Sequence, residues 1–159
     1  MDSIKTQLQK LDLSQLKMES GNSVAAELKR HARILANCIQ YELDKVYNSY
    51  EPKVYKRTFG TYHSLMIGGL EIKVTATGAA LGISVLFDEN AVHKGFDGEP
   101  VDIALLLNEG WSWHNGLEIP YMSNRAGTHF IEAGIEKYQQ KMKNPFAVKL
   151  KIGDEIREF

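Results

Sequence analysis

Apolar residues recur every three or four positions between residues 23 and 47, and this spacing predicts a long amphipathic helix. Asn22 and Ser23 are both suitable N-cap residues at its start. Lys29, Arg30 and Arg33 fall outside the apolar positions, so we expect the helix to pack along one side and to expose a basic one. The apolar stripe consists of Val24, Leu28, Ala32, Leu35, Ile39, Leu43 and Val46.

Strict alternation of apolar and polar residues follows in two later regions. It predicts an antiparallel hairpin over about 70–87, with one apolar face that the helix at 23–47 is best placed to cover. The same alternation predicts a C-terminal strand over about 146–152, at a sheet edge where lysines discourage stray pairing.

Two further helices are predicted on either side of an aromatic loop. The first is short, with Pro100 in its first turn and Gly110 at its C-terminal cap, and the second spans about 128–142 with Thr128 as its cap. The loop carries Trp111, Trp113 and His114, and we expect it to contact a partner.

These elements predict an α+β fold, in which an antiparallel sheet (hairpin about 70–87 plus strand about 146–152) packs against helices at about 23–47 and about 128–142. The 159 residues suit one domain over 22–159, preceded by an N-terminal arm at 1–21. No apolar run approaches the roughly 20 residues of a membrane-spanning helix, so no membrane contact is expected. The single cysteine, Cys38, adjoins the apolar stripe and is interpreted as a buried thiol.

Charge is unevenly distributed along the chain. Residues 1–60 contain ten Lys or Arg and seven Asp or Glu, whereas residues 88–118 contain seven acidic residues and one lysine. The asymmetry suits a basic face of one subunit meeting an acidic face of another, and a solvated acidic loop explains it equally well.

Basic and aromatic residues alternate in the segment 50–62. This pattern suits single-stranded nucleic acid, a protein interface, or a loop that packs its rings on the sheet. The interface candidates there are Tyr50, Tyr55, Lys56, Arg57 and Tyr62.

Motifs of known chemistry are missing from the sequence. The five histidines stand in no HxxxH or HExxH arrangement, and the spacing of Asp88, Glu89 and His93 does not fit a metal site. Glu109 beside two tryptophans is the best candidate for a general acid acting on a sugar, but the second carboxylate is not identifiable. We therefore expect no catalytic residue, cofactor or metal, and count Glu109 among the interface candidates.

Several short motifs, taken in order, resemble the tail-completion (tail-to-head joining, neck or minor tail) proteins of long-tailed bacteriophages. The resemblance covers about residues 22–142. The motifs are Tyr50-x-Pro52-x-x-Tyr55-Lys56-Arg57-Thr58, Phe87-Asp88-Glu89, Leu107-Asn108-Glu109-Gly110 and Gly127-Thr128-His129-Phe130-Ile131-Glu132.

The resemblance implies a structural virion protein without catalysis, cofactor or metal. Its expected partners are copies of itself in a hexamer-like ring, tail-tube or tail-terminator proteins and head-connector proteins, with DNA passing through the ring. Its expected location is the virion, after assembly in the host cytoplasm. Two alternatives stay open: a single-stranded nucleic-acid-binding module using 50–62, and a small carbohydrate-acting enzyme using Glu109.

Overall fold

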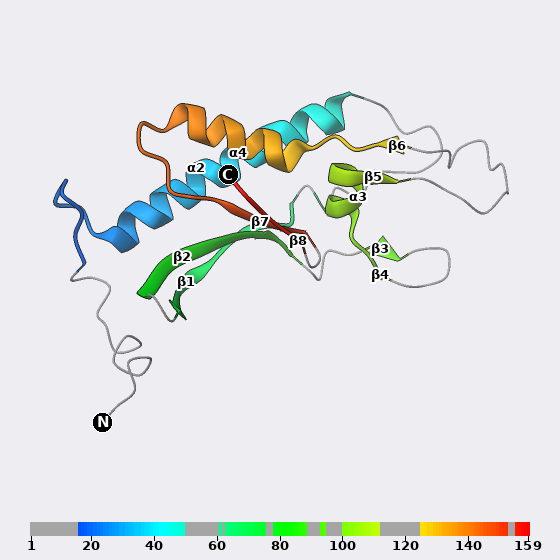
Figure 1. Ribbon diagram of the computed structural model, residues 1–159. Helices are drawn as coiled ribbons and strands as arrows, with labels where there is room; N and C mark the ends of the chain where they lie inside the picture. The colour runs from blue at the N-terminus through cyan, green and yellow to red at the C-terminus, as the bar shows by residue number, and fades with distance from the viewer. Residues whose placement is uncertain are drawn as a thin grey trace, which may run out of the picture.

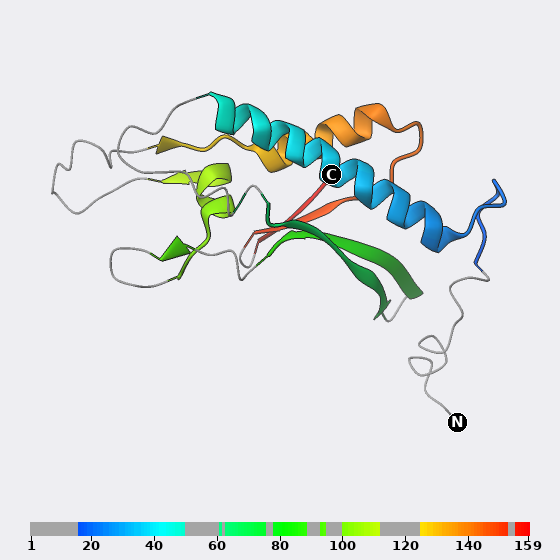
Figure 2. The same cartoon turned by 180° about the vertical axis from the view of Figure 1, so that it is seen from behind.

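The computed structural model confirms the α+β class, with a long helix at the centre. It describes residues 16–49, 61, 63–75, 78–88, 93–94, 100–111, 125–152 and 155–159. Helix α2 (Val24–Asn48) contacts both helix α4 (Phe130–Lys141) and the hairpin formed by β1 (Leu65–Thr75) and β2 (Gly78–Phe87) (Figure 1). α2 and α4 run in opposite directions, and the hairpin covers another side of α2 (Figure 2).

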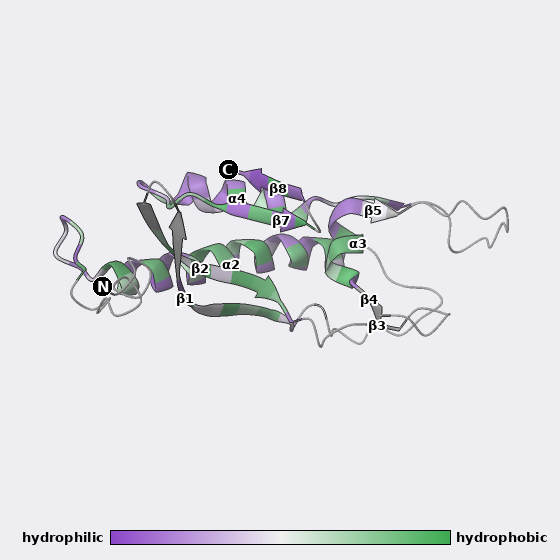
Figure 3. Ribbon diagram, turned by 60° about the horizontal axis from the view of Figure 1, so that its bottom comes forward, coloured by the Kyte–Doolittle hydropathy of each residue, from purple (hydrophilic) through white to green (hydrophobic). Residues whose placement is uncertain are grey.

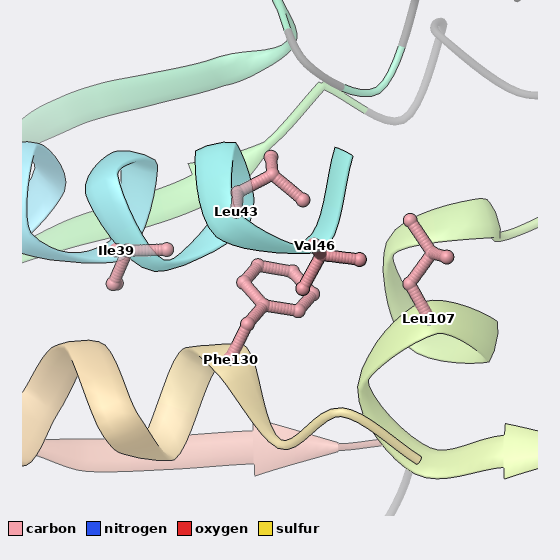
Figure 4. Packing of buried hydrophobic residues seen from close by; sticks show 5 residues of the cluster. All are labelled: Ile39, Leu43, Val46, Leu107 and Phe130. Atoms are coloured by element: carbon pink, nitrogen blue, oxygen red, sulfur yellow. The ribbon is translucent and has the colours of Figure 1, made fainter. Parts of the chain in front are cut away.

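The apolar stripe predicted for α2 forms the core. Leu43 is fully buried and Ile39 and Val46 nearly so, and they pack with Leu107 and Phe130 from later elements (Figure 4). Burying a side chain of this size contributes about 1.5–3 kcal/mol relative to leaving it in water. The hydropathy colouring accordingly divides α2 into an apolar and a polar side (Figure 3).

The predicted hairpin is present and begins five residues earlier than the alternation indicated. Leu65 pairs with Phe87, and the register shifts between Ile67 and Leu70, where Gly68 and Gly69 stand. Leu65, Val85 and Phe87 pack against the core cluster, so α2 covers the apolar face of the hairpin as expected. The alternation did not reveal residues 65–69 because the bulge interrupts the period of two.

Four two-stranded antiparallel sheets account for the described strands, which makes the sheet structure more divided than the alternation predicted. The C-terminal strand β7 (Lys149–Ile152) pairs with β8 (Glu155–Glu158) and not with the hairpin. The other pairs are β3 (His93–Lys94) with β4 (Pro100–Val101), and β5 (Gly110–Trp111) with β6 (Arg125–Ala126).

The two later helices are present, but the residues predicted to start them are wrong. Pro100 lies in β4, and the short helix α3 (Ile103–Glu109) begins after Asp102, whose carboxylate accepts from the Leu105 amide at 3.0 Å. Asp102 is the better cap because its side chain supplies the acceptor that the first helical amides require. α4 begins after His129 and not at Thr128. The predicted C-terminal cap at Gly110 is confirmed, with φ 81°.

The described part of the predicted N-terminal arm forms a turn before α2. Lys17 and Ser23 form an isolated antiparallel bridge, and the Val24 amide donates to the Leu16 carbonyl. Gly21 has φ 83°, a conformation that suits glycine at this turn. Residues 1–15 lie outside the described residues. None of the described helices is long and apolar enough to cross a membrane.

Candidate functional site

The two motifs that flank the tryptophan loop meet at the junction of α3 and α4. The Thr128 amide donates to the Leu107 carbonyl and the His129 amide to the Asn108 carbonyl, both at 3.0 Å. Gly110 and Gly127 permit this approach, since a Cβ on Gly110 would lie 2.4 Å from the Arg125 carbonyl oxygen. We call this set of contacts between residues 107–110 and 125–129 the α3–α4 joint.

Asn108 is the buried centre of the α3–α4 joint. Its side-chain oxygen accepts from the Ile131 amide at 2.9 Å, so a residue of α3 caps the first turn of α4. Its amide nitrogen donates to Glu109 Oε1 at 2.7 Å. Thr128, the cap that the sequence predicts for α4, instead donates its hydroxyl to the Leu107 carbonyl at 2.7 Å. His129, immediately before α4, adopts the left-handed conformation with φ 49°.

An ionic cluster lies beside the α3–α4 joint. Arg157 of β8 contacts Glu132 Oε1 at 2.8 Å and Glu109 Oε2 at 3.4 Å. His129 Nδ1 lies 3.9 Å from Glu132 Oε1. The C-terminal hairpin is thereby attached to both α3 and α4 by one guanidinium.

The same cluster is the one group among the described residues that brings three possible metal ligands together. One ligand atom each from Glu109, His129 and Glu132 lies within 4.8 Å of the others. These are ligand types that zinc accepts. However, the Arg157 guanidinium already supplies the cation between the two carboxylates, so the arrangement fits an ion-pair network better than a metal site.

A second buried polar group connects α2 to the far end of α4. His31 Nδ1 lies 2.7 Å from the Tyr138 hydroxyl, which accepts from the Phe146 amide at 2.9 Å. The Arg30 guanidinium can only donate to His31 Nε2, which places the imidazole proton on Nδ1. Burial, followed by the charge of Arg30, lowers the pKa of His31, so the neutral ring is favoured.

Helix α2 carries two further side chains of chemical interest, the buried Cys38 and the exposed Tyr41. Cys38 is buried, as the sequence predicts, and burial raises the pKa of its thiol. One turn further along α2, Tyr41 is 49% exposed and Lys137 of α4 lies 3.3 Å from its ring centroid. Lys45 lies 4.8 Å from the same centroid.

Only two of the predicted interface residues lie within the described residues. Glu109 belongs to the α3–α4 joint and its ionic cluster, and the Trp111 backbone pairs with Arg125 in β5 and β6. Glu109 thus ends α3, and Trp111 lies in the strand β5 that directly follows it. The other candidates, Tyr50, Tyr55, Lys56, Arg57, Tyr62, Trp113 and His114, lie outside the described residues.

Sequence reasoning missed the roles of Asn108, Arg157 and the His31–Tyr138 pair. An Asn at the end of an apolar helical run, followed by Glu and Gly, was a usable signal for a buried cap. Arg157 gave no local signal for its attachment to the helices, because Glu132 and Glu109 are 25 and 48 residues away.

These features define an α+β protein in which two of the sequence motifs, Leu107–Gly110 and Gly127–Glu132, form a structural joint between helices. Comparison with known families then places it: the YomN family model matches residues 4–151, and the chain belongs to this family. The family carries the name of a Bacillus phage-derived gene, which indicates a phage-related protein. No curated protein and no solved structure matches the chain.

Proposed function

We propose that this chain is a structural subunit of a bacteriophage neck or tail, which completes the tail and joins it to the head connector as part of a ring, without catalysis. The observation that carries the proposal is the family match over residues 4–151, which links nearly the whole chain to phage. The sequence resemblance to tail-completion proteins supplies the finer role. The proposed partners are further copies of the chain, tail-tube or tail-terminator proteins and head-connector proteins, and the proposed location is the virion.

The geometry of the motifs supports a structural role. Backbone hydrogen bonds and a buried cap hold the two segments Asn108-Glu109-Gly110 and Gly127-Thr128-His129 together. Side chains in such a position suit a structural role better than a catalytic one. Both oxygens of Glu109 already have partners, Asn108 and Arg157, which argues against the alternative of a general acid acting on a sugar.

The α3–α4 joint also gives the neighbouring loop a defined base. β5 and β6 pair Gly110 with Ala126 and Trp111 with Arg125, so both ends of segment 112–124 are fixed. Trp111, Trp113 and His114 are the proposed contacts with the neighbouring virion protein.

A phage deleted for this gene provides the test. Electron microscopy of lysates should show separate heads and tails, and a copy supplied in trans should restore joined particles. Complementation by Trp111→Ala or Arg57→Ala should fail although both variants fold. Lys151→Ala, at an exposed position of β7, is the matched control and should complement.

Joined, infective particles from the deletion strain would overturn the proposal. So would a neck reconstruction, together with native mass spectrometry of the particle, in which the subunit is absent. Failure of a variant counts only when its circular dichroism and unfolding midpoint match those of the unmodified chain.

A further inference from the structure

One side of α2 is covered neither by α4 nor by the β1–β2 hairpin, and it presents a row of exposed residues (Figure 2). Successive members of the row are four residues apart, which makes them neighbours on the helix surface. The row contains three cations, one amide and one tyrosine, and no acidic residue. We call it the basic row of α2, and it consists of Lys29, Arg33, Asn37, Tyr41 and Lys45.

The first two cations of the basic row are not neutralised within the described part of the chain. Lys29 and Arg33 have no ion-pair partner among the described residues, whereas Lys45 pairs with Glu42 at 2.8 Å. Like charges four residues apart destabilise a helix, so these two side chains repel each other. An anionic ligand between them would remove this repulsion.

Further cations adjoin the basic row. The Lys137 ammonium of α4 lies 3.3 Å from the Tyr41 ring centroid, and the Lys45 ammonium lies 4.8 Å from it. The acidic residues of α2 near the row are only partly exposed, namely Glu27, Glu42 and Asp44. The cations on and beside the row outnumber them, namely Lys29, Arg30, Arg33, Lys45 and Lys137. This surface therefore keeps a positive charge after its own acidic residues are counted.

The composition of the basic row fits phosphate groups better than a protein surface. Lysine, arginine, asparagine and tyrosine side chains all contact phosphates in protein–DNA complexes. The centre of a protein interface is instead depleted of charge and contains apolar side chains. On α2, Tyr41 is the one large hydrophobic side chain that is exposed, so the helix offers no apolar centre for such an interface. Charge complementarity therefore favours a polynucleotide.

A DNA duplex is favoured over a single strand, because the basic row offers no free surface for base stacking. Proteins that bind single strands stack successive bases on aromatic side chains. The row has one aromatic ring, and the Lys137 ammonium already lies 3.3 Å from its centroid. A duplex needs no stacking, since its phosphates attract cations regardless of sequence. From Lys29 to Lys45 the helix rises about 24 Å, so the row can extend past several phosphates of one strand.

We propose that the basic row of α2 is a sequence-independent binding site for double-stranded DNA. Lys29 and Arg33 each contact a phosphate, and the remaining residues of the row extend the contact along the backbone of the duplex. This activity goes beyond the proposed structural role and does not depend on it. It also assigns nucleic acid to a different element from segment 50–62, which the alternation of basic and aromatic residues indicated.

The salt dependence of binding tests this site. Fluorescence anisotropy of the full chain with a labelled duplex of mixed sequence should give a Kd of about 10⁻⁴–10⁻⁶ M near physiological salt. The logarithm of Kd should rise linearly with the logarithm of the salt concentration, because phosphate contacts release counterions. Each neutralised phosphate contributes about 0.9 to the slope, so Lys29 and Arg33 together should contribute about 1.8.

Lys29→Gln with Arg33→Gln should therefore lower the slope by about 1.8. Between about 50 and about 200 mM salt, the affinity of this variant should fall about twelvefold less than that of the unmodified chain. A weaker Kd with an unchanged slope would mean that these residues make no phosphate contact, and it would overturn the inference.

Two matched variants serve as controls. Lys149→Gln with Lys151→Gln removes the same charge from exposed positions of β7 and should leave the slope unchanged. Lys29→Arg with Arg33→Lys keeps both charges of the basic row and should also retain the slope. Absence of duplex binding by the unmodified chain, or an equal loss of slope in the β7 variant, would overturn the inference.

Two competing occupants are identified by the same measurement. Tighter binding of a single strand, lost in Lys56→Gln with Arg57→Gln and retained in the variant of the basic row, would assign nucleic acid to segment 50–62 and overturn the inference. Tighter binding of polyglutamate than of the duplex would indicate an acidic protein partner and would also overturn it. The proposed function fails separately, since the deletion strain would then yield joined particles while the basic row still binds the duplex. Unjoined heads and tails without duplex binding would retain the function and remove this site.

Discussion

At the scale of single residues, Asn108 performs two tasks from one buried position. It closes the first turn of α4 through its oxygen and fixes Glu109 through its nitrogen. A residue of this kind has no apolar substitute, because removal of its side chain leaves the part-buried Ile131 amide without this acceptor.

Asn108→Ala should therefore lower the free energy of unfolding by about 2–3 kcal/mol, the combined cost of a lost cap and an unsatisfied amide. Urea unfolding followed by circular dichroism measures the loss. Asn144→Ala, at an exposed position after α4, is the matched control and should change stability by less than about 0.5 kcal/mol. Equal stabilities of the two variants would contradict the role assigned to Asn108.

His31 makes stability depend on pH. Burial and Arg30 lower its folded-state pKa below the ordinary 6.5, so its contribution is complete above pH 6.5. As pH falls below 6.5, the unfolded chain takes up a proton that the folded chain does not, and stability is lost until the lowered folded-state pKa is passed.

Urea unfolding at about pH 7.5 and about pH 5.5 should show this loss, which amounts to about 1.4 kcal/mol for each unit by which the pKa is lowered. His31→Gln should lose less stability over the same interval, because it retains the other four histidines but not this one. An equal pH dependence in both proteins would show that another group titrates.

At the scale of elements, the contact between α2 and α4 depends on the absence of a side chain. A Cβ at Gly134 would lie 2.7 Å from the Ile39 Cα, an atom that cannot move without displacing α2. The close crossing in turn allows Phe130 and Ile135 to be almost completely buried.

Gly134→Ala should therefore destabilise the protein by about 1–3 kcal/mol, although alanine favours helix by about 1 kcal/mol over glycine. Gly82→Ala provides the control, since nothing lies within 4 Å of a Cβ there. Thermal unfolding of the two variants measures the difference, and a stabilised Gly134→Ala variant would refute the close crossing.

The β7–β8 hairpin is an element attached by few contacts outside itself. Arg157 reaches Glu132 and Glu109, while the pair between Lys149 and Glu158 stays within the hairpin and is largely exposed. Arg157→Gln should therefore accelerate hydrogen exchange of the Val148 and Phe159 amides more than Lys149→Gln does. Equal exchange in the two variants would mean that Arg157 does not attach the hairpin.

At the scale of the whole molecule, α2 contacts both the β1–β2 hairpin and α4. The α3–α4 joint extends these contacts to Trp111 of β5. We expect the chain from residue 22 onward to unfold as one cooperative unit. Tryptophan fluorescence, which reports on Trp111 and Trp113, should have the same urea midpoint as circular dichroism, which reports on the helices. Two separated midpoints would indicate two domains.

The sequence by itself determined the elements whose signal is local. The stripe of α2, the alternation of the hairpin and the glycine that ends α3 all follow from the period of a helix or strand and from the conformational freedom of glycine. The fold class followed from these periods, and the tail-completion hypothesis from short motifs in a fixed order.

Only the tertiary structure decided which distant groups meet. The cap that Asn108 supplies to Ile131, the pairing of β7 with β8, and the attachment of Arg157 to Glu109 join residues separated along the chain. Such contacts leave no periodic trace, because a hydrogen bond or ion pair needs only one suitable residue at each end. The physical reason is that periodicity indicates which side of a helix or strand is buried. Which residues of another element contact that side depends on how the elements pack together.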